Sequence, residues 1–386
     1  MNRLACFGSD DPAPGTADLV QGNNAFALDL YARIREDAGN LFVSPYSISS
    51  ALALTYAGAR GETAAQMAQA LRFFPDQELF HRQFAALEAG FRDLGKRGKV
   101  RLRSANRLWP RTGYDLRDDY VRLLKARYGV TVQPLDYRDT EAARTTINRW
   151  VEQQTEDRIK NLVLPGNLSA ETLLVLVNAI YFKGNWASQF DPALTREAPF
   201  WMTADKSVPV PMMTQTQTVR WGRWRELLML EMPYEGGDLS MLVLLPTARD
   251  GLAELEASLT LDNLHLWASQ LWEDNVQLQL PRFKLDFRFM VNGVLSALGM
   301  DDAFRPGAAD FSGIAGKESR FYIDLIIHQA FVQVDEVGTE AAAATAIVER
   351  SMPPTFRADH PFFFLIRENS SGSILFLGRV ANPAAS

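Results

Sequence analysis

Residues 173–182 read Leu-Leu-Val-Leu-Val-Asn-Ala-Ile-Tyr-Phe, and this stretch does most to decide the fold of the chain of 386 residues. Every position except Asn178 is apolar. A continuous apolar run of strand length, without polar alternation, is typical of a strand that is covered on both faces. We therefore expect residues 173–182 to form a central strand of a sheet.

Helical patterns precede this strand, and strand patterns follow it. Apolar residues recur at helical spacing from Asn23 to Asp37, and Ser44-Pro45 is predicted to open a buried helix that ends at Ala57. Further helices are predicted over residues 63–71, 77–94, 118–128 and 141–160, with an alternating strand over 100–108. After Lys183 we expect strands over residues 208–213, 227–233, 240–245, 276–283, 321–334, 362–367 and 374–379, and one helix over 290–298. This order indicates an α+β protein with one shared core.

Composition excludes several classes of protein. The chain is 47% hydrophobic and lacks a recognisable linker, so it can bury one large core. A net charge of -6 disfavours bulk attraction to nucleic acid. Cys6 is the only cysteine, which excludes an intramolecular disulfide and a zinc site made of cysteines. No run approaches the ~20 apolar residues of a membrane span.

A second unusual stretch covers residues 336–354, Glu-Val-Gly-Thr-Glu-Ala-Ala-Ala-Ala-Thr-Ala-Ile-Val-Glu-Arg-Ser-Met-Pro-Pro. As a strand it would place one mostly small set of side chains on a single face, Thr339, Ala341, Ala343, Thr345 and Ile347. Such a strand could slide between two existing strands without a steric clash. An alanine-rich helix capped by Thr339 is the alternative, and one segment could adopt both conformations in turn.

The two ends of this stretch carry different signals. Gly338 would permit the reversal of the backbone that lets the segment swing. Arg350-Ser351 is a basic site suited to a trypsin-like protease, and Pro353-Pro354 would keep the following backbone extended. The stretch can therefore be both a protease bait and a strand that inserts later.

The motifs together resemble the serpin family. The segment from Asn178 to Trp186, with Phe190 following, is similar to that family's central-strand motif. Four further segments resemble its buried helix start, its helix across the main sheet and its two C-terminal strands: Ser44–Ile48, Ile147–Val151, His360–Arg367 and Ile374–Arg379. The resemblance runs in order from about Asn23 to Pro383.

The resemblance implies a flexible tail over residues 1–22 and a single serpin domain over 23–386. That domain would have three β-sheets, about nine helices and an exposed reactive-centre loop at about residues 336–356. The chain would not be an enzyme but a suicide substrate of a serine protease. Residues 338–350 would insert into the main sheet after cleavage and distort the acyl-enzyme.

The position of the cleaved bond depends on the direction of counting. The family's usual spacing from Gly338 leads to Met352, whereas counting back from Pro361 leads to Arg350. Met352-Pro353 is a poor bond for most serine proteases because proline follows it. We therefore predict cleavage at Arg350-Ser351 by a trypsin-like protease, with Ser351 or Met352 and another protease class as the alternative.

Three further groups of residues follow from the resemblance. The insertion hinge would comprise Glu336, Gly338, Thr339, Glu340, Ala341, Ala342, Ala343 and Ala344. Its small side chains favour inhibition over a non-inhibitory binding or chaperone role. A buried polar cluster, the shutter, would comprise Ser44, Ser47, Asn178 and His328, and it would latch two strands of the main sheet. At the point of insertion, the breach, Trp186 would accompany an ion pair of Arg282 with Glu336.

The remaining polar residues suggest little further chemistry. His81, His265 and His360 show no partner pattern, and no metal site, cofactor motif or nucleophile elbow is apparent, so neither a metal nor a cofactor is expected. A basic run, Lys96, Arg97, Lys99, Arg101 and Arg103, is interpreted as a solvated face rather than a site for sulfated polysaccharide. The resemblance implies a monomer in an extracellular or cell-envelope location. Residues 1–20 show no signal peptide, and a cytoplasmic location stays open.

Overall fold

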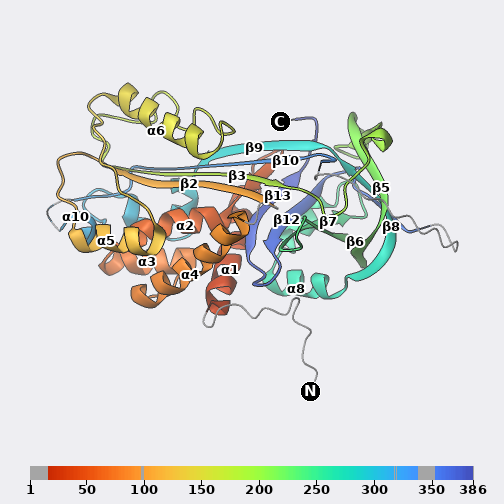
Figure 1. The fold of residues 1–386 in the computed structure, drawn as a ribbon, viewed down its shortest axis with the longest axis horizontal. Coiled ribbons are helices and arrows are strands. Elements are labelled where there is room, and N and C mark those ends of the chain that lie inside the picture. Colours follow the sequence, from red (N-terminus) through yellow and green to blue (C-terminus); the bar gives the residue numbers. More distant parts are fainter. Residues whose placement is uncertain (1–15, 97–99, 317, 319, 338–352, 386) are drawn as a thin grey trace, which may run out of the picture.

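The computed structural model describes residues 16–96, 100–316, 318, 320–337 and 353–385. Within these ranges the chain forms ten α-helices and thirteen strands, which confirms the expected α+β class (Figure 1). Among the described residues, none of the helices is both long enough and apolar enough to cross a bilayer.

Five helices form one end of the molecule: α1 (Ala17–Ile34), α2 (Pro45–Tyr56), α3 (Gly61–Leu71), α4 (Gln77–Lys96) and α5 (Asp118–Tyr128). The predicted start of α1 at Asn23, and with it a flexible tail reaching residue 22, is wrong. Leu19 and Val20 already lie in the core. Gly22, which weakens the helical signal, is needed for packing, because a Cβ there would lie 2.6 Å from the carbonyl oxygen of Arg72.

A four-stranded sheet crosses the molecule in the order β2 (Val100–Pro110), β3 (Leu174–Gly184), β10 (Leu325–Val334) and β9 (Phe283–Met290). The central position predicted for β3 is confirmed, and its residues from Leu174 to Phe182 are buried. Strands β3 and β10 run parallel, with Val175 opposite Leu325 and Phe182 opposite Val332. Helix α6 (Thr140–Gln154) covers one face of this sheet and α2 lies on the other (Figure 1).

The remaining strands form a nine-stranded ladder that bends at its longest member, β5 (Ser207–Trp224). The first half of β5 pairs with β4 (Arg196–Trp201), and its last residues pair with β6 (Leu227–Pro233). On one side of the bend lie β8 (Trp272–Pro281) and β11 (Thr355–Arg357). On the other lie β7 (Leu239–Pro246), β12 (Phe362–Glu368), β13 (Ile374–Val380) and β1 (Leu41–Val43). Two sheets joined through β5, with the four-stranded sheet, account for the expected three.

Short elements complete the described chain: α7 (Leu252–Ala257), α8 (Leu261–Ser269), α9 (Asn292–Ala297), α10 (Ser312–Ala315), and the 3-10 turns η1 (Pro192–Leu194) and η2 (Asp302–Phe304). The helix predicted over residues 290–298 starts only at Asn292, because β9 continues to Met290. The strand predicted from residue 321 begins at Leu325, and the helix predicted to reach residue 160 ends at Gln154. Helices α7 and α8 were not predicted from the sequence, because each is short.

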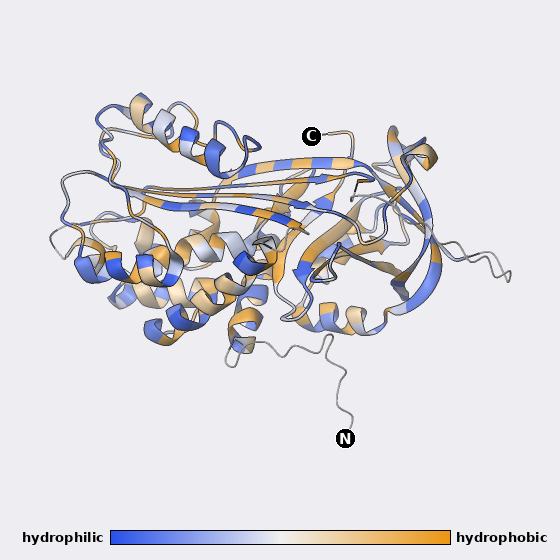
Figure 2. Ribbon diagram, viewed as in Figure 1, coloured by the Kyte–Doolittle hydropathy of each residue, from blue (hydrophilic) through white to orange (hydrophobic). Residues whose placement is uncertain are grey.

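Apolar side chains fill the spaces between these layers. Figure 2 shows the strands at the centre largely orange, whereas blue residues mark the outer turns of the helices. One cluster lies between the sheets and α1 to α5, and a second between the four-stranded sheet and α6. The four-stranded sheet is thus buried on both faces, as the composition of β3 predicts.

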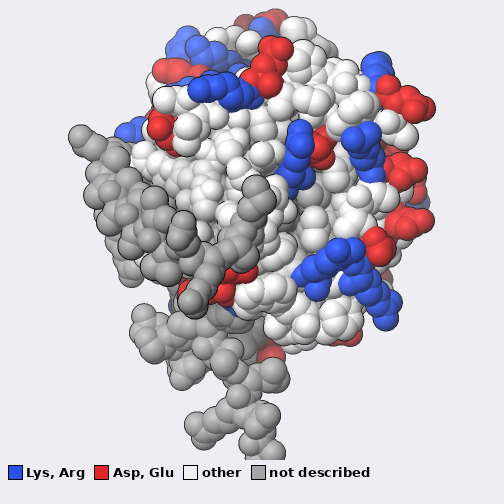
Figure 3. Space-filling view, turned by 90° about the vertical axis from the view of Figure 1, so that its right-hand side faces the viewer, with Lys and Arg blue, Asp and Glu red and all other residues white. Residues whose placement is uncertain are grey.

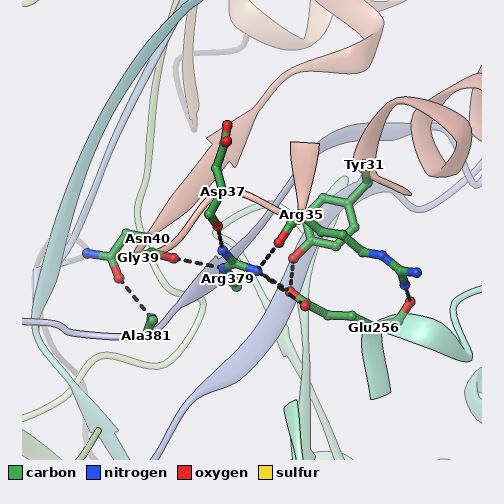
Figure 4. A network of polar contacts seen from close by, with 8 residues as sticks. All are labelled: Tyr31, Arg35, Asp37, Gly39, Asn40, Glu256, Arg379 and Ala381. Atoms are coloured by element: carbon green, nitrogen blue, oxygen red, sulfur yellow. Dashed lines mark hydrogen bonds and ion pairs between the residues drawn. The ribbon is translucent and has the colours of Figure 1, made fainter. Parts of the chain in front are cut away.

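A buried ionic network ties the C-terminal strand β13 to the rest of the fold (Figure 4). The Arg379 guanidinium contacts both carboxylate oxygens of Glu256, at 3.1 and 3.2 Å, and the Tyr31 hydroxyl donates to the same carboxylate at 2.5 Å. Arg379 also donates to the backbone carbonyls of Gly39, Arg35 and Asp37. One side chain on β13 therefore anchors α1, α7 and the connection before β1.

Candidate functional site

The candidate site begins where the parallel strands β3 and β10 end side by side. Beyond β10 the described chain continues to Val337, which is 51% exposed. A small cavity of about 30 Å³ lies here, and its lining includes Gly184, Trp186, Tyr234 and Val337. Gly184 is required at this point, because a Cβ would lie 2.5 Å from the ring of Tyr234. The described chain therefore reaches Val337 at the end of the β3–β10 pair.

An ion pair fixes the chain just after β10. Arg282 Nε lies 2.5 Å from Glu336 Oε2, and the Thr195 hydroxyl donates to the other carboxylate oxygen. The Glu336 side chain is 3% exposed, whereas that of Arg282 is 43% exposed. Burial alone would raise the pKa of Glu336, but the hydrogen bonds from Arg282 and Thr195 lower it below its ordinary value. Glu336 is therefore ionised at neutral pH.

Trp186 links the ends of the two parallel strands. Its indole Nε1 donates to the backbone carbonyl of Asp335 at 3.1 Å. Its ring stacks on Tyr234, with centroids 4.7 Å apart. Trp186, Arg282 and Glu336, which the resemblance grouped as the breach, thus lie around one point at the end of β10.

A polar row crosses the four-stranded sheet in the middle of its apolar core. Asn178 on β3 lies opposite His328 on β10 and opposite Asn106 on β2. His328 contacts Asn178 Oδ1 through Nδ1, and the Asn178 amide donates to Asn106 Oδ1. We call these three residues the polar row. Because they share a register position, it spans the boundary that an inserting strand would have to open.

Residues at the N-terminus of α2 form hydrogen bonds with the polar row. The Asn178 amide donates to the carbonyl of Ser47 at 2.8 Å and to its hydroxyl at 2.6 Å. The backbone N–H of Ser44 donates to His328 Nε2 at 3.2 Å, and the Ser44 hydroxyl donates to Leu375 on β13. The structure therefore brings together Ser44, Ser47, Asn178 and His328, the four residues of the shutter.

The protonation of His328 follows from its partners. Because the Ser44 N–H can only donate, Nε2 of His328 must be unprotonated, and Nδ1 carries the proton that Asn178 Oδ1 accepts. Complete burial lowers the pKa of His328 to about 3. The polar row is therefore neutral at physiological pH.

Three residues of this arrangement were missed at the level of the sequence. Asn106 donates to the Ser50 hydroxyl at 3.1 Å, and Ser50 donates to the carboxylate of Glu88. Ser50 and Glu88 lie on the helices α2 and α4. Their convergence depends on helix packing and strand register, and no spacing in the sequence indicates it.

Several predicted site residues lie outside the described residues. They are Gly338, Thr339, Glu340, Ala341, Ala342, Ala343, Ala344, Arg350 and Ser351. Both flanks are described. Before the gap, Val337 is the last described residue after β10. After the gap, the carbonyl of Pro354 accepts a hydrogen bond from the N–H of Gln277 at 2.9 Å, directly before β11 pairs with β8.

The histidines outside the polar row occupy separate places. His81 is buried against the Tyr128 hydroxyl, 2.5 Å from Nδ1, and desolvation lowers its pKa to about 4. His360 lies between the Asp359 carboxylate and the Pro246 carbonyl, at 2.9 and 2.6 Å. His265 is exposed. Among the described residues, no group of three or more potential metal ligands comes together.

The basic run is partly neutralised where the structure describes it. Arg101 and Arg103 on β2 both pair with Glu156, at 3.4 and 2.9 Å. Arg97 and Lys99 lie outside the described residues. The paired arginines are less available to an anionic polymer than their sequence spacing suggests.

Comparison with known proteins agrees with this architecture. A family model described as Serpin (serine protease inhibitor) matches residues 21–383. Leukocyte elastase inhibitor of Homo sapiens is 43% identical over 381 residues, which cover 95% of this chain and 99% of that protein. Serpin B8 of Homo sapiens is 40% identical over 377 residues, covering 95% and 100%. The structure of uncleaved ovalbumin matches with a TM-score of 0.87 at 31% identity, over 94% of this chain and 100% of that chain.

The chain therefore belongs to the serpin family, and the matches support inhibition of serine proteases. The expected serpin fold is confirmed. The broad expectation that the chain is not an enzyme needs correction. The family description and the names of the relatives refer to inhibition of proteases. They therefore support only the narrower conclusion that the chain is not itself a protease.

Proposed function

We propose that this serpin is a suicide-substrate inhibitor of trypsin-like proteases that is cleaved between Arg350 and Ser351. Cleavage by the target would leave its catalytic serine esterified to the carbonyl carbon of Arg350. The chain from Gly338 to Arg350 would then enter the four-stranded sheet between β3 and β10 and displace the attached protease. The predicted hinge, shutter and breach would serve this movement.

The observation that carries the proposal is the position of Val337, the last residue described before the candidate loop, at the β3–β10 boundary. The described chain continues past the end of β10 to Val337, which lines the cavity between the ends of the two parallel strands. A strand that turns back from this point would run antiparallel to both neighbours. Each new ladder hydrogen bond would contribute on the order of 1 kcal/mol, so a long inserted strand gains enough to distort a bound protease.

The proposed specificity depends on Arg350. The described surface at the end of the molecule near β5 and β8 carries basic and acidic side chains interspersed (Figure 3). Such a surface creates no strong field of one sign that would select a protease by charge. The side chain at the cleaved bond therefore becomes the main determinant of the target, and an arginine there suits a protease with an acidic specificity pocket.

A second target class is supported by the names of several relatives. The matched Homo sapiens protein is named leukocyte elastase inhibitor, and this chain carries Ile347 and Val348 before the arginine and Met352 after it. An elastase-like protease with an apolar specificity pocket would cleave beside one of these apolar residues instead. The length of the released C-terminal peptide would then differ from the one that cleavage after Arg350 gives.

The test is a reaction of the purified chain with trypsin and, separately, with a leukocyte elastase. We expect a covalent complex with trypsin that resists denaturing detergent, and a released peptide that begins at Ser351 and ends at Ser386. Arg350→Ala should abolish that complex. Cleavage between Arg350 and Ser351 without a covalent complex would contradict inhibition of trypsin-like proteases. A complex with elastase alone would indicate that the cleaved bond follows an apolar residue instead.

A further inference from the structure

The polar row extends through two helices to the side chain of Glu88. Asn106 Nδ2 donates to Ser50 on α2, and the Ser50 hydroxyl donates to Glu88 Oε1 on α4. Five side chains, His328, Asn178, Asn106, Ser50 and Glu88, therefore form one continuous chain of hydrogen bonds, which we call the relay. It connects the β3–β10 boundary with a carboxylate whose side chain is 12% exposed.

Every hydrogen bond of the relay points in the same direction. The Ser44 N–H holds Nε2 of His328 as an acceptor, so Nδ1–H donates to Asn178. The Asn178 amide then donates to Asn106, Asn106 to Ser50, and Ser50 to the carboxylate. A backbone donor sets one end, and the Glu88 oxygen that accepts from Ser50 sets the other. Aligned hydrogen bonds polarise one another, so each strengthens its neighbours.

The surroundings of Glu88 show that its carboxylate is held in place. Arg92 on the same helix lies 3.6 Å from its second oxygen, and the Tyr46 hydroxyl of α2 is a further hydrogen-bond partner. Tyr128 of α5 is a titratable neighbour. Burial raises the pKa of Glu88, while the Ser50 hydrogen bond and the charge of Arg92 oppose the rise. A buried carboxylate costs stability, so its retention here fits a role that an apolar residue could not fill.

We propose that Glu88 is a positioning residue for the opening of the sheet: its carboxylate aligns the relay and thereby holds Asn178 against His328 until the loop inserts. The inference rests on the proposed function, because only a chain that inserts its loop has to separate β3 from β10. Removing the acceptor at Glu88 frees the Ser50 hydroxyl to turn. Asn106 then loses its fixed direction and its hydrogen bond to Asn178 weakens, so Asn178 is held only by Ser47 and His328 and the β3–β10 boundary opens more often.

Amide hydrogen exchange, measured by mass spectrometry on the intact chain, tests this directly. The amides to follow are those of β3 and β10 around Asn178 and His328. Glu88→Leu removes the acceptor, and we expect exchange there to become about tenfold faster, because the last hydrogen bond of the relay is lost. Glu88→Gln keeps a neutral acceptor and should give about a threefold increase. Glu78→Gln, at an exposed position of the same helix, is the matched control and should change nothing.

The result that overturns the assignment is exchange in β3 and β10 that stays at the wild-type rate in Glu88→Leu while only α2 and α4 change. That pattern would mark Glu88 as a local packing residue. Should Glu88→Leu fail to fold, Ser50→Ala breaks the relay one bond earlier with little change in volume, and the same acceleration is expected. Unchanged exchange in that variant would also overturn it.

The exchange measurement needs no protease, so it separates the two proposals. If the wild-type chain forms no covalent complex while the variants still accelerate exchange, the proposed function fails and the role of Glu88 in sheet opening stands. If the covalent complex forms and the variants exchange at the wild-type rate, the proposed role of Glu88 is wrong and the proposed function as an inhibitor is supported.

Discussion

Two buried polar clusters in this serpin are built from different kinds of groups. The network of Arg379, Glu256 and Tyr31 contains a full ion pair and three backbone carbonyls. The polar row of Asn106, Asn178 and His328 contains only neutral side chains. The first joins β13 to α1 and α7, whereas the second spans the β3–β10 boundary that the proposed insertion would open.

The difference shows how burial of charge separates permanent contacts from reversible ones. A buried ion pair that loses a partner leaves an uncompensated charge, so it resists any movement that would separate it. Neutral hydrogen bonds can be exchanged for others at much lower cost, provided that each group finds a new partner. The inserted strand could supply such partners to Asn178 and His328.

The largest expected effect comes from breaking the permanent network. Arg379→Met should lower the free energy of unfolding by about 3–5 kcal/mol, because Glu256 is left buried without its partner. Urea unfolding followed by tryptophan fluorescence measures this. Combining Arg379→Met with Glu256→Leu should restore much of the loss, since neither charge then remains buried. A single variant as stable as the wild type would show that the network is not the anchor described here.

Breaking the polar row should cost less and act on a different property. Asn178→Ala leaves the Nδ1–H of His328 without an acceptor, which should destabilise the native chain by about 1–3 kcal/mol. The same change should accelerate spontaneous loss of inhibition on incubation at elevated temperature, because β3 and β10 separate more readily. Asn263→Ala, which removes an amide on α8 that donates to the carbonyl of Ser258, is the control. Equal rates of inactivation in both variants would contradict a special role for the polar row.

The neutral state of the buried histidines predicts a dependence on pH. His328 has a pKa lowered to about 3, and His81 a pKa lowered to about 4. The unfolded chain binds these protons near pH 6.5, so stability is complete above that pH and falls as the pH drops toward the native values. Each histidine contributes a slope of about 1.4 kcal/mol per pH unit once its unfolded form is protonated.

Unfolding midpoints measured in urea between pH 6.5 and pH 5 isolate this effect, because most carboxylates stay ionised there. His81→Phe should remove one of the two slopes and leave the slope that His328 produces. A wild-type midpoint that stays constant over this range would contradict the neutral assignment of the row.

The smallest expected effect belongs to the ion pair at the end of β10. Arg282→Gln should cost only about 1 kcal/mol at neutral pH, because the arginine is half in solvent and the Thr195 hydroxyl still donates to the Glu336 carboxylate. The pKa of Glu336 is lowered in the native chain, so the contribution is present above its unfolded pKa and is lost as the pH falls through the native value. The variant and the wild type should therefore converge in stability only at a pH below the ordinary pKa of a glutamate. A difference that persists in acid would assign Arg282 a role other than pairing with Glu336.

Much of the fold was accessible from the sequence because its main signals are local. The apolar run over residues 173–182 identified a central strand, and Ser44-Pro45 identified the start of α2. The resemblance grouped two sets of residues, Glu336 with Arg282 and the four residues of the shutter. The structure places the members of each set together.

The remainder depends on contacts between distant segments. The start of α1 at Ala17 was missed because Gly22 lowers helix propensity, although it is needed where the helix meets Arg72. Packing determines where β5 changes its pairing partners, and no periodic pattern in the sequence marks this point. Ser50 and Glu88 lie on separate helices, and their meeting with Asn106 follows only from the register of β2 against β3.

The most direct test of the account compares thermal melting of the intact chain with that of the chain cleaved after Arg350. Insertion of the freed segment between β3 and β10 adds a full strand of ladder hydrogen bonds. The melting temperature of the cleaved chain should then rise by about 20 °C or more. An unchanged melting temperature after complete cleavage would show that the segment does not insert, and it would contradict a suicide-substrate mechanism for this serpin.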